Sequence, residues 1–162
     1  MPSPSPADWT TELRTRLGGL RDEYRASLHD ALAGLTEEEV RLRLLPSKTT
    51  LLGLLKHVTF VEGVWFDQAI TGRPDAEIGI PSTPDRSFTL NPSDTIASVR
   101  EAHQARCESS RRTMAELPLD TVVDGRGERP VWALQLQVLR ELAQHAGHAD
   151  ILREQILARR PG

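Results

Sequence analysis

The stretch that decides the fold is Val131–Arg160, VWALQLQVLRELAQHAGHADILREQILARR. Apolar residues recur along it every three or four positions, which is the spacing of one face of an α-helix. Pro130 suits the first turn of such a helix, and the basic pair Arg159 and Arg160 suits its C-terminal end. The pattern predicts one long helix at the C-terminal end of the chain.

Three further segments have the same periodicity, and strand signals are almost absent. Helices are predicted over about 8–35, 49–71 and 93–117, and a short connecting helix over 36–43. Residues 73–92 contain four prolines, which predict a long ordered loop that borders a functional site. The fold class predicted is therefore all-α: a single four-helix-bundle domain over 8–160, with a disordered leader over 1–7 and the long loop between the second and third helices.

The composition places the chain in the soluble, globular class. Its 162 residues suit one domain, with 38% apolar residues and 27% charged residues of both signs. A net charge of −3 argues against a nucleic-acid partner, and no apolar run approaches the roughly 20 residues that span a bilayer. The single cysteine, Cys107, cannot form an internal disulfide, which fits a cytoplasmic protein. Its polar neighbours favour a thiol without a role in catalysis.

One histidine, His57, lies within the apolar segment LLGLLKHVTF. Its helix face is largely apolar, so the imidazole is predicted to point inward and to need either a hydrogen-bond partner or a metal ion. The other two histidines outside the last helix, His29 and His103, have polar neighbours in the sequence. They are predicted to be solvated.

The last helix carries Glu141, His145 and His148 at positions i, i+4 and i+7, so all three project from one face. Bundle cores commonly hold metals between facing helices, and three ligands would leave one position open, as in catalytic sites. Imidazole and carboxylate donors suit Zn²⁺ or Ni²⁺. The alternative is a polar stripe, with Glu141 as the hydrogen-bond partner of His145. The spacing leaves both interpretations open.

Two segments, LLPSKTTLLGLLKHVTFVEGVWF (44–66) and ELAQHAGHADILRE (141–154), resemble the DinB/YfiT-like superfamily of metalloenzymes. The similarity is greatest to its actinobacterial branch, which is related to mycothiol-dependent maleylpyruvate isomerase. The resemblance implies a four-helix bundle in which one histidine of the second helix and two residues of the last helix hold a divalent metal.

Carried over to this chain, the resemblance implies His57, His145 and His148 as metal ligands, with Glu141 as a substitute third ligand or a fourth. It also implies that Glu62 and Trp65 line the pocket, the alternative for Trp65 being a place in the core. No catalytic residue is assigned.

The resemblance also implies thiol chemistry. The metal would stabilise the thiolate of a small cofactor, with mycothiol the first choice and bacillithiol the second. Attack on an electrophile would make the protein an S-transferase, or an isomerase if the thiol later leaves, with the loop 73–92 shaping the pocket. The alternative is a non-catalytic metal- or ligand-binding stress-response bundle. An exposed apolar stripe on the first or last helix would make the protein a homodimer in either case.

Overall fold

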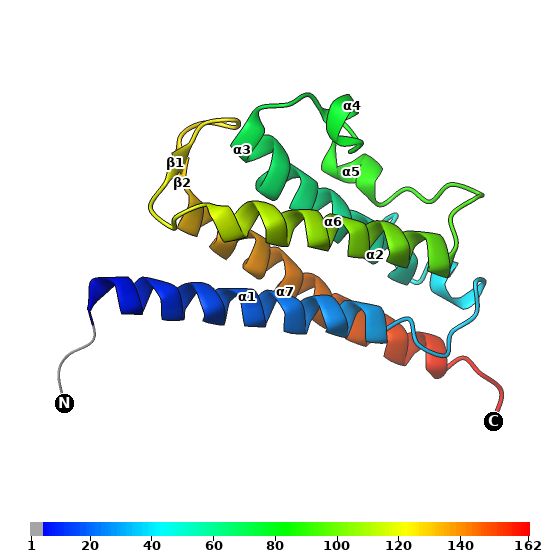
Figure 1. The fold of residues 1–162 in the computed structure, drawn as a ribbon. Coiled ribbons are helices and arrows are strands. Elements are labelled where there is room, and N and C mark those ends of the chain that lie inside the picture. Colours follow the sequence, from blue (N-terminus) through cyan, green and yellow to red (C-terminus); the bar gives the residue numbers. More distant parts are fainter. Residues whose placement is uncertain (1–4) are drawn as a thin grey trace.

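The computed structural model of the protein describes residues 5–162, with the backbone alone for residues 6–9. Most of the expected leader, residues 1–4, therefore lies outside the described residues, and Pro6 begins the first helix. Four long helices dominate the described residues and confirm the all-α bundle, and Figure 1 shows how they lie along one another. They are α1 (Pro6–Asp30), α2 (Leu51–Gly63), α6 (Ile96–Glu116) and α7 (Val131–Leu157). α1 packs along α7, α7 also packs on α2, and α2 packs on α6.

Shorter elements join the four helices. They are a 3₁₀ turn η1 (Glu39–Arg41), a π-helical turn η2 (Val64–Gln68), α3 (Ala69–Thr71), α4 (Asp75–Ile78), α5 (Pro84–Ser87), β1 (Val122–Val123) and β2 (Arg129–Pro130). The helix predicted over 49–71 is thus α2, η2 and α3 in succession. The predicted long loop carries the two short helices α4 and α5. The first helix ends at Asp30, before Leu35, because the chain reverses at Gly34, which has a φ of 72°.

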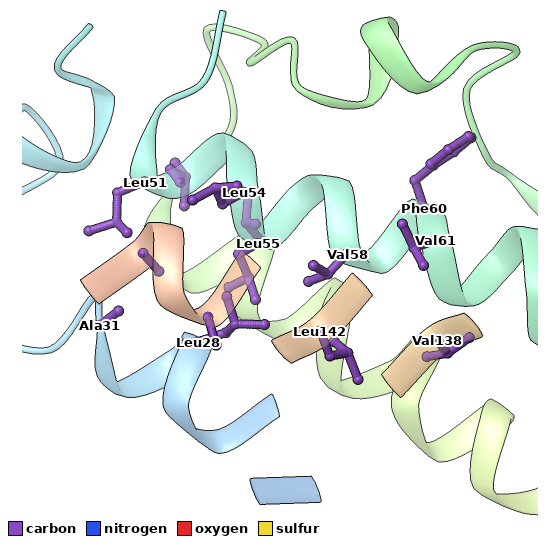
Figure 2. Packing of buried hydrophobic residues seen from close by; sticks show 14 of the residues in the cluster. Leu28, Ala31, Leu51, Leu54, Leu55, Val58, Phe60, Val61, Val138 and Leu142 are labelled. Atoms are coloured by element: carbon purple, nitrogen blue, oxygen red, sulfur yellow. The ribbon is translucent and has the colours of Figure 1, made fainter. Parts of the chain in front are cut away.

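The apolar core lies where α2 meets α1 and α7. Figure 2 shows Leu55 and Val58 of α2 over Leu142 of α7, with Leu28 of α1 beside them. Each of these four side chains is at most 2% exposed, and full burial of such a side chain contributes about 1.5–3 kcal/mol relative to exposure. Because α2 is covered on nearly every side, a polar residue on it needs a partner within the protein.

Two glycines let loops pack tightly on the helix that runs from α2 to α3. A Cβ atom at Gly53 would lie 2.9 Å from the carbonyl oxygen of Phe88, so the loop after α5 lies directly on α2. A Cβ atom at Gly125 would lie 2.2 Å from the carbonyl oxygen of Gln68. The Gly125 N–H instead donates to the carbonyl of Ala69 at 2.9 Å, which holds the turn between β1 and β2 against α3.

Among the described residues, no helix is both long and apolar enough to cross a membrane.

Candidate metal centre

Three donor side chains converge where α2 faces α7. His57, Glu141 and His145 each offer a ligand atom, and these atoms all lie within 4.8 Å of one another. The Nε2 atom of His145 is 3.4 Å from Oε2 of Glu141, and the Nε2 atom of His57 is 4.0 Å from the same oxygen. Glu141 and His145 are one helical turn apart on α7, so a single packing contact between two helices assembles the whole set.

The His57 ring is held in one orientation by the loop around α5. Its Nδ1 atom is 2.7 Å from Oγ of Ser87, and that hydroxyl donates its own proton to the carbonyl of Pro84 at 2.5 Å. The hydroxyl must therefore accept from Nδ1–H, which leaves the lone pair on Nε2 facing Glu141. Phe88 stacks on the ring at 4.0 Å with an interplanar angle of 11°. A ligating histidine needs this kind of outer support.

Both histidines are neutral near pH 7. Burial and, to a smaller extent, the nearby imidazole of His145 lower the pKa of His57 to about 4. Burial also lowers the pKa of His145, a shift that Glu141 opposes and His148 reinforces. Neutral imidazoles and a carboxylate are the donors that Zn²⁺ accepts, so the residues present fit a divalent metal ion.

A cavity of about 240 Å³ opens beside His57 and Glu141. Apolar or aromatic side chains and polar or charged ones contribute equally to its walls, so it suits a small molecule with both an apolar and a polar part. It is lined by His57, Phe60, Val61, Val64, Trp65, Asp75, Pro81, Ser82, Pro84, Arg126, Gln137 and Glu141. Trp65 lies in the π-helical turn, a distortion that often occurs at functional sites, and the guanidinium groups of Arg126 and Arg129 lie over its ring.

A comparison with protein-family models matches residues 16–158 to the mycothiol-S-transferase family. The chain belongs to the mycothiol-S-transferase family. This membership confirms the resemblance to the DinB-like superfamily, and the matched range contains the three donors and every residue that lines the cavity. No curated protein matches the chain.

In this mycothiol-S-transferase family member, Glu141 and His148 take different places. Glu141 lies in the cluster with His57 and His145, whereas His148 is exposed and is not part of it. The Nδ1 atoms of His148 and His145 are 3.3 Å apart, so His148 contacts the far side of the His145 ring. The structure thus brings together His57 and His145, two of the three ligands that the resemblance implies. Glu141, the substitute that it implies, is the third member of the cluster, in place of His148.

Of the two residues expected to line the pocket of the mycothiol-S-transferase family member, Trp65 does and Glu62 does not. Glu62 is fully buried, and its carboxylate is bound by Arg25 of α1. Five residues separate it from His57, which is about 140° around a helix of 3.6 residues per turn. That angle was the available signal that the two side chains point in different directions.

The prediction that His29 and His103 are solvated is wrong. His103 is 0% exposed and His29 is 9% exposed. The Nε2 atom of His29 lies 2.7 Å from the Nδ1 atom of His103. The two rings meet between α1 and α6, a contact that polar neighbours along the chain do not reveal. Sequence reasoning also missed Ser87, Phe88 and Arg126, which reach this family member's site from loops.

Proposed function

We propose that the protein is a metal-dependent transferase that joins the thiol of mycothiol to a small electrophile. The observation that carries this proposal is the placement of His57, Glu141 and His145 beside one cavity, in a chain of the mycothiol-S-transferase family. Three protein donors would leave a position for an exchangeable ligand, which is the arrangement of catalytic rather than structural sites.

His57, Glu141 and His145 would hold Zn²⁺ or Ni²⁺ in this site. When bound, such an ion supplies a Lewis acid that favours the thiolate, the nucleophilic form of a thiol. The reaction forms a carbon–sulfur bond, breaks the bond between carbon and its leaving group, and releases the thiol proton to solvent. An isomerase results if the thiolate instead adds to an activated carbon–carbon double bond, with no leaving group lost, and is later eliminated from the same carbon.

The remaining residues of the cavity bind and orient the reactants. Phe60 and Trp65 offer apolar surface to an electrophile and exclude water from it. Asp75, Gln137 and Arg126 offer hydrogen-bonding groups to the polar part of a thiol cofactor. Ser87 keeps a proton on Nδ1 of His57 and thereby keeps its Nε2 atom available as a ligand.

The test is the reaction of mycothiol with monochlorobimane, followed by the fluorescence of the adduct. Protein loaded with Zn²⁺ or Ni²⁺ should accelerate the reaction above the uncatalysed rate, and Glu141→Gln should return it to background. His148→Gln is the matched control, about two turns away on the same helix, and should retain most of the rate. The same assay with bacillithiol compares the two thiols.

Two results would contradict the proposal. Metal-loaded protein without any acceleration would favour the non-catalytic metal-binding bundle. Activity that survives Glu141→Gln and is lost in His148→Gln would replace Glu141 by His148 in the ligand set.

A further inference from the structure

A second cluster of donor side chains lies on the opposite side of α2. Glu62 of α2 converges with His103 and Cys107, which are one turn apart on α6, and all three are buried. Oε2 of Glu62 is 3.3 Å from Sγ of Cys107 and 3.4 Å from Nε2 of His103. The Cys107 sulfur is 3.4 Å from the same imidazole nitrogen.

These three separations match the edges of a tetrahedral zinc site. With Zn–S bonds of about 2.3 Å and Zn–N or Zn–O bonds of about 2.0–2.1 Å, ligand atoms lie roughly 3.3–3.6 Å apart. We propose that Glu62, His103 and Cys107 bind a second divalent metal ion of the thiolate-preferring class, such as Zn²⁺. This site shares no residue with the His57 centre and does not depend on the transferase proposal.

Side chains of α1 hold two of the three proposed ligands, His103 and Glu62, in place. His29 contacts the second nitrogen of His103 at 2.7 Å, and the Nε atom of Arg25 donates to Glu62 at 3.1 Å. Ligating histidines and carboxylates are commonly held in this way. The Nε atom of Arg100 donates to Nδ1 of His29 at 3.2 Å, which directs a proton to Nε2 of His103. Metal binding would move that proton to Nδ1, and half-buried Arg100 would release His29.

A carboxylate and a thiolate would neutralise the charge of a bound divalent ion. The Arg25 guanidinium keeps a second acidic partner, Asp22, whose Oδ1 atom lies 2.7 Å from it and also accepts from the half-exposed Arg111 at 2.9 Å. Without metal, burial and the neighbouring Glu62 raise the pKa of the Cys107 thiol, which keeps its proton. Metal binding would therefore release the thiol proton, as it does at other thiolate sites.

The metal has a route to this cluster. A cleft of about 570 Å³ between α1 and α6 is open to solvent and reaches His103 and Cys107. Such a path is a requirement for a metal site, and the cleft also has room for a water molecule as the fourth ligand. The bound ion would connect α2 directly to α6, and would connect both to α1 through His29 and Arg25.

Cobalt tests the inference because a thiolate ligand gives Co²⁺ an intense charge-transfer band in the near ultraviolet. Cys107 is the only cysteine of the chain, so the band reports this site alone. Titration of the metal-free protein should develop the band up to about one equivalent of Co²⁺ per chain. His57→Ala, which damages the other centre, should retain the band, and Cys107→Ser should lose it while it still binds Co²⁺ at the His57 centre.

Absence of the band from wild-type protein with excess Co²⁺ would overturn the inference, whether or not the His57 centre is occupied. So would a band that disappears in His57→Ala while that variant remains folded. Because the wild-type spectrum decides the matter, failure of Cys107→Ser to fold does not affect the result. Failure of the transferase proposal would appear separately, as a loss of bimane transfer.

Discussion

At the scale of single residues, the His57 centre depends on one hydroxyl group. Ser87 is 0% exposed, and its hydroxyl donates its only proton to a backbone carbonyl. Towards His57 it can therefore act only as the acceptor from Nδ1–H. This arrangement selects the tautomer whose Nε2 atom faces Glu141. The orientation of the His57 Nε2 lone pair is therefore set partly by a residue thirty positions away in the sequence.

Replacement Ser87→Ala should weaken Zn²⁺ binding by about 10–100-fold, because the imidazole loses the partner that orients it. The measurement is a competition titration against a zinc chelator. Ser93→Ala, in an exposed position between α5 and α6 and outside the cavity, is the control and should bind Zn²⁺ as the wild type does. Equal affinities for all three proteins would show that Ser87 does not orient the ligand.

The stability of the chelator-treated protein should depend on pH through His57. Its pKa is about 4 in the folded protein, because of burial and of His145, and about 6.5 when unfolded. Between these values the unfolded chain binds more protons, so the free energy of unfolding should fall by about 2–3 kcal/mol as the pH drops from 6.5 to 4. Urea unfolding of wild type and His57→Gln across this range measures the difference. If the free energies of unfolding of the two proteins changed with pH in the same way, the assignment of this pH dependence to His57 would be contradicted.

At the scale of elements, the pocket is built by segments that pack on one interrupted helix. α2, η2 and α3 form a nearly continuous rod, the loop after α5 covers its start, and the turn between β1 and β2 covers its end. The close approaches occur at Gly53 and Gly125, where a side chain would collide with backbone atoms. These glycines let the loop after α5 and the turn between β1 and β2 lie directly on the helix backbone.

The substitution Gly53→Ala should destabilise the protein by about 1–3 kcal/mol, because the new methyl group would meet the carbonyl oxygen of Phe88 at 2.9 Å. Gly19→Ala is the matched control within a helix, since no atom lies within 4 Å of the added group. It should stabilise by about 0.5–1 kcal/mol through its better helix propensity. Urea unfolding of both variants gives the comparison, and stabilisation by both would refute the close packing of the loop.

At the scale of the whole molecule, the bundle has two kinds of interior. α1 and α7 share mainly apolar contacts with α2, whereas charged and imidazole groups fill the space between α1 and α6. Arg25 and Glu62 form the central ion pair of this polar region, at 6% and 0% side-chain exposure. Such a pair contributes little net stability when intact, but it is costly to break.

The substitution Arg25→Met should destabilise the metal-free protein by about 3–5 kcal/mol, because the Glu62 carboxylate would stay buried without its partner. Arg16→Met removes an exposed arginine that pairs with Glu12 on the same helix, and should cost less than about 1 kcal/mol. Thermal and urea unfolding measure both changes. Similar losses of unfolding free energy in the two variants would show that the buried Arg25–Glu62 pair costs no more to break than an exposed ion pair.

The periodicity of 3.6 residues was sufficient to predict the four helices, and the resemblance was sufficient to place donors on the second and the last. It was not sufficient to choose between Glu141 and His148, because both lie within about 60° of His145 around the helix. That choice depends on where α2 crosses α7. Ser87 and Arg126 were beyond prediction for a similar reason, since their contacts join segments distant in the sequence.

The burial of Cys107 has a further consequence for a protein that belongs to a thiol-transfer family. Cys107, the only cysteine of the chain, is 4% exposed, and its sulfur atom lies between Glu62 and His103. An oxidised low-molecular-weight thiol therefore has little access to it, and the folded chain should resist mixed-disulfide formation under oxidative stress. Such a protein would keep its structure when the cellular pool of small thiols becomes oxidised.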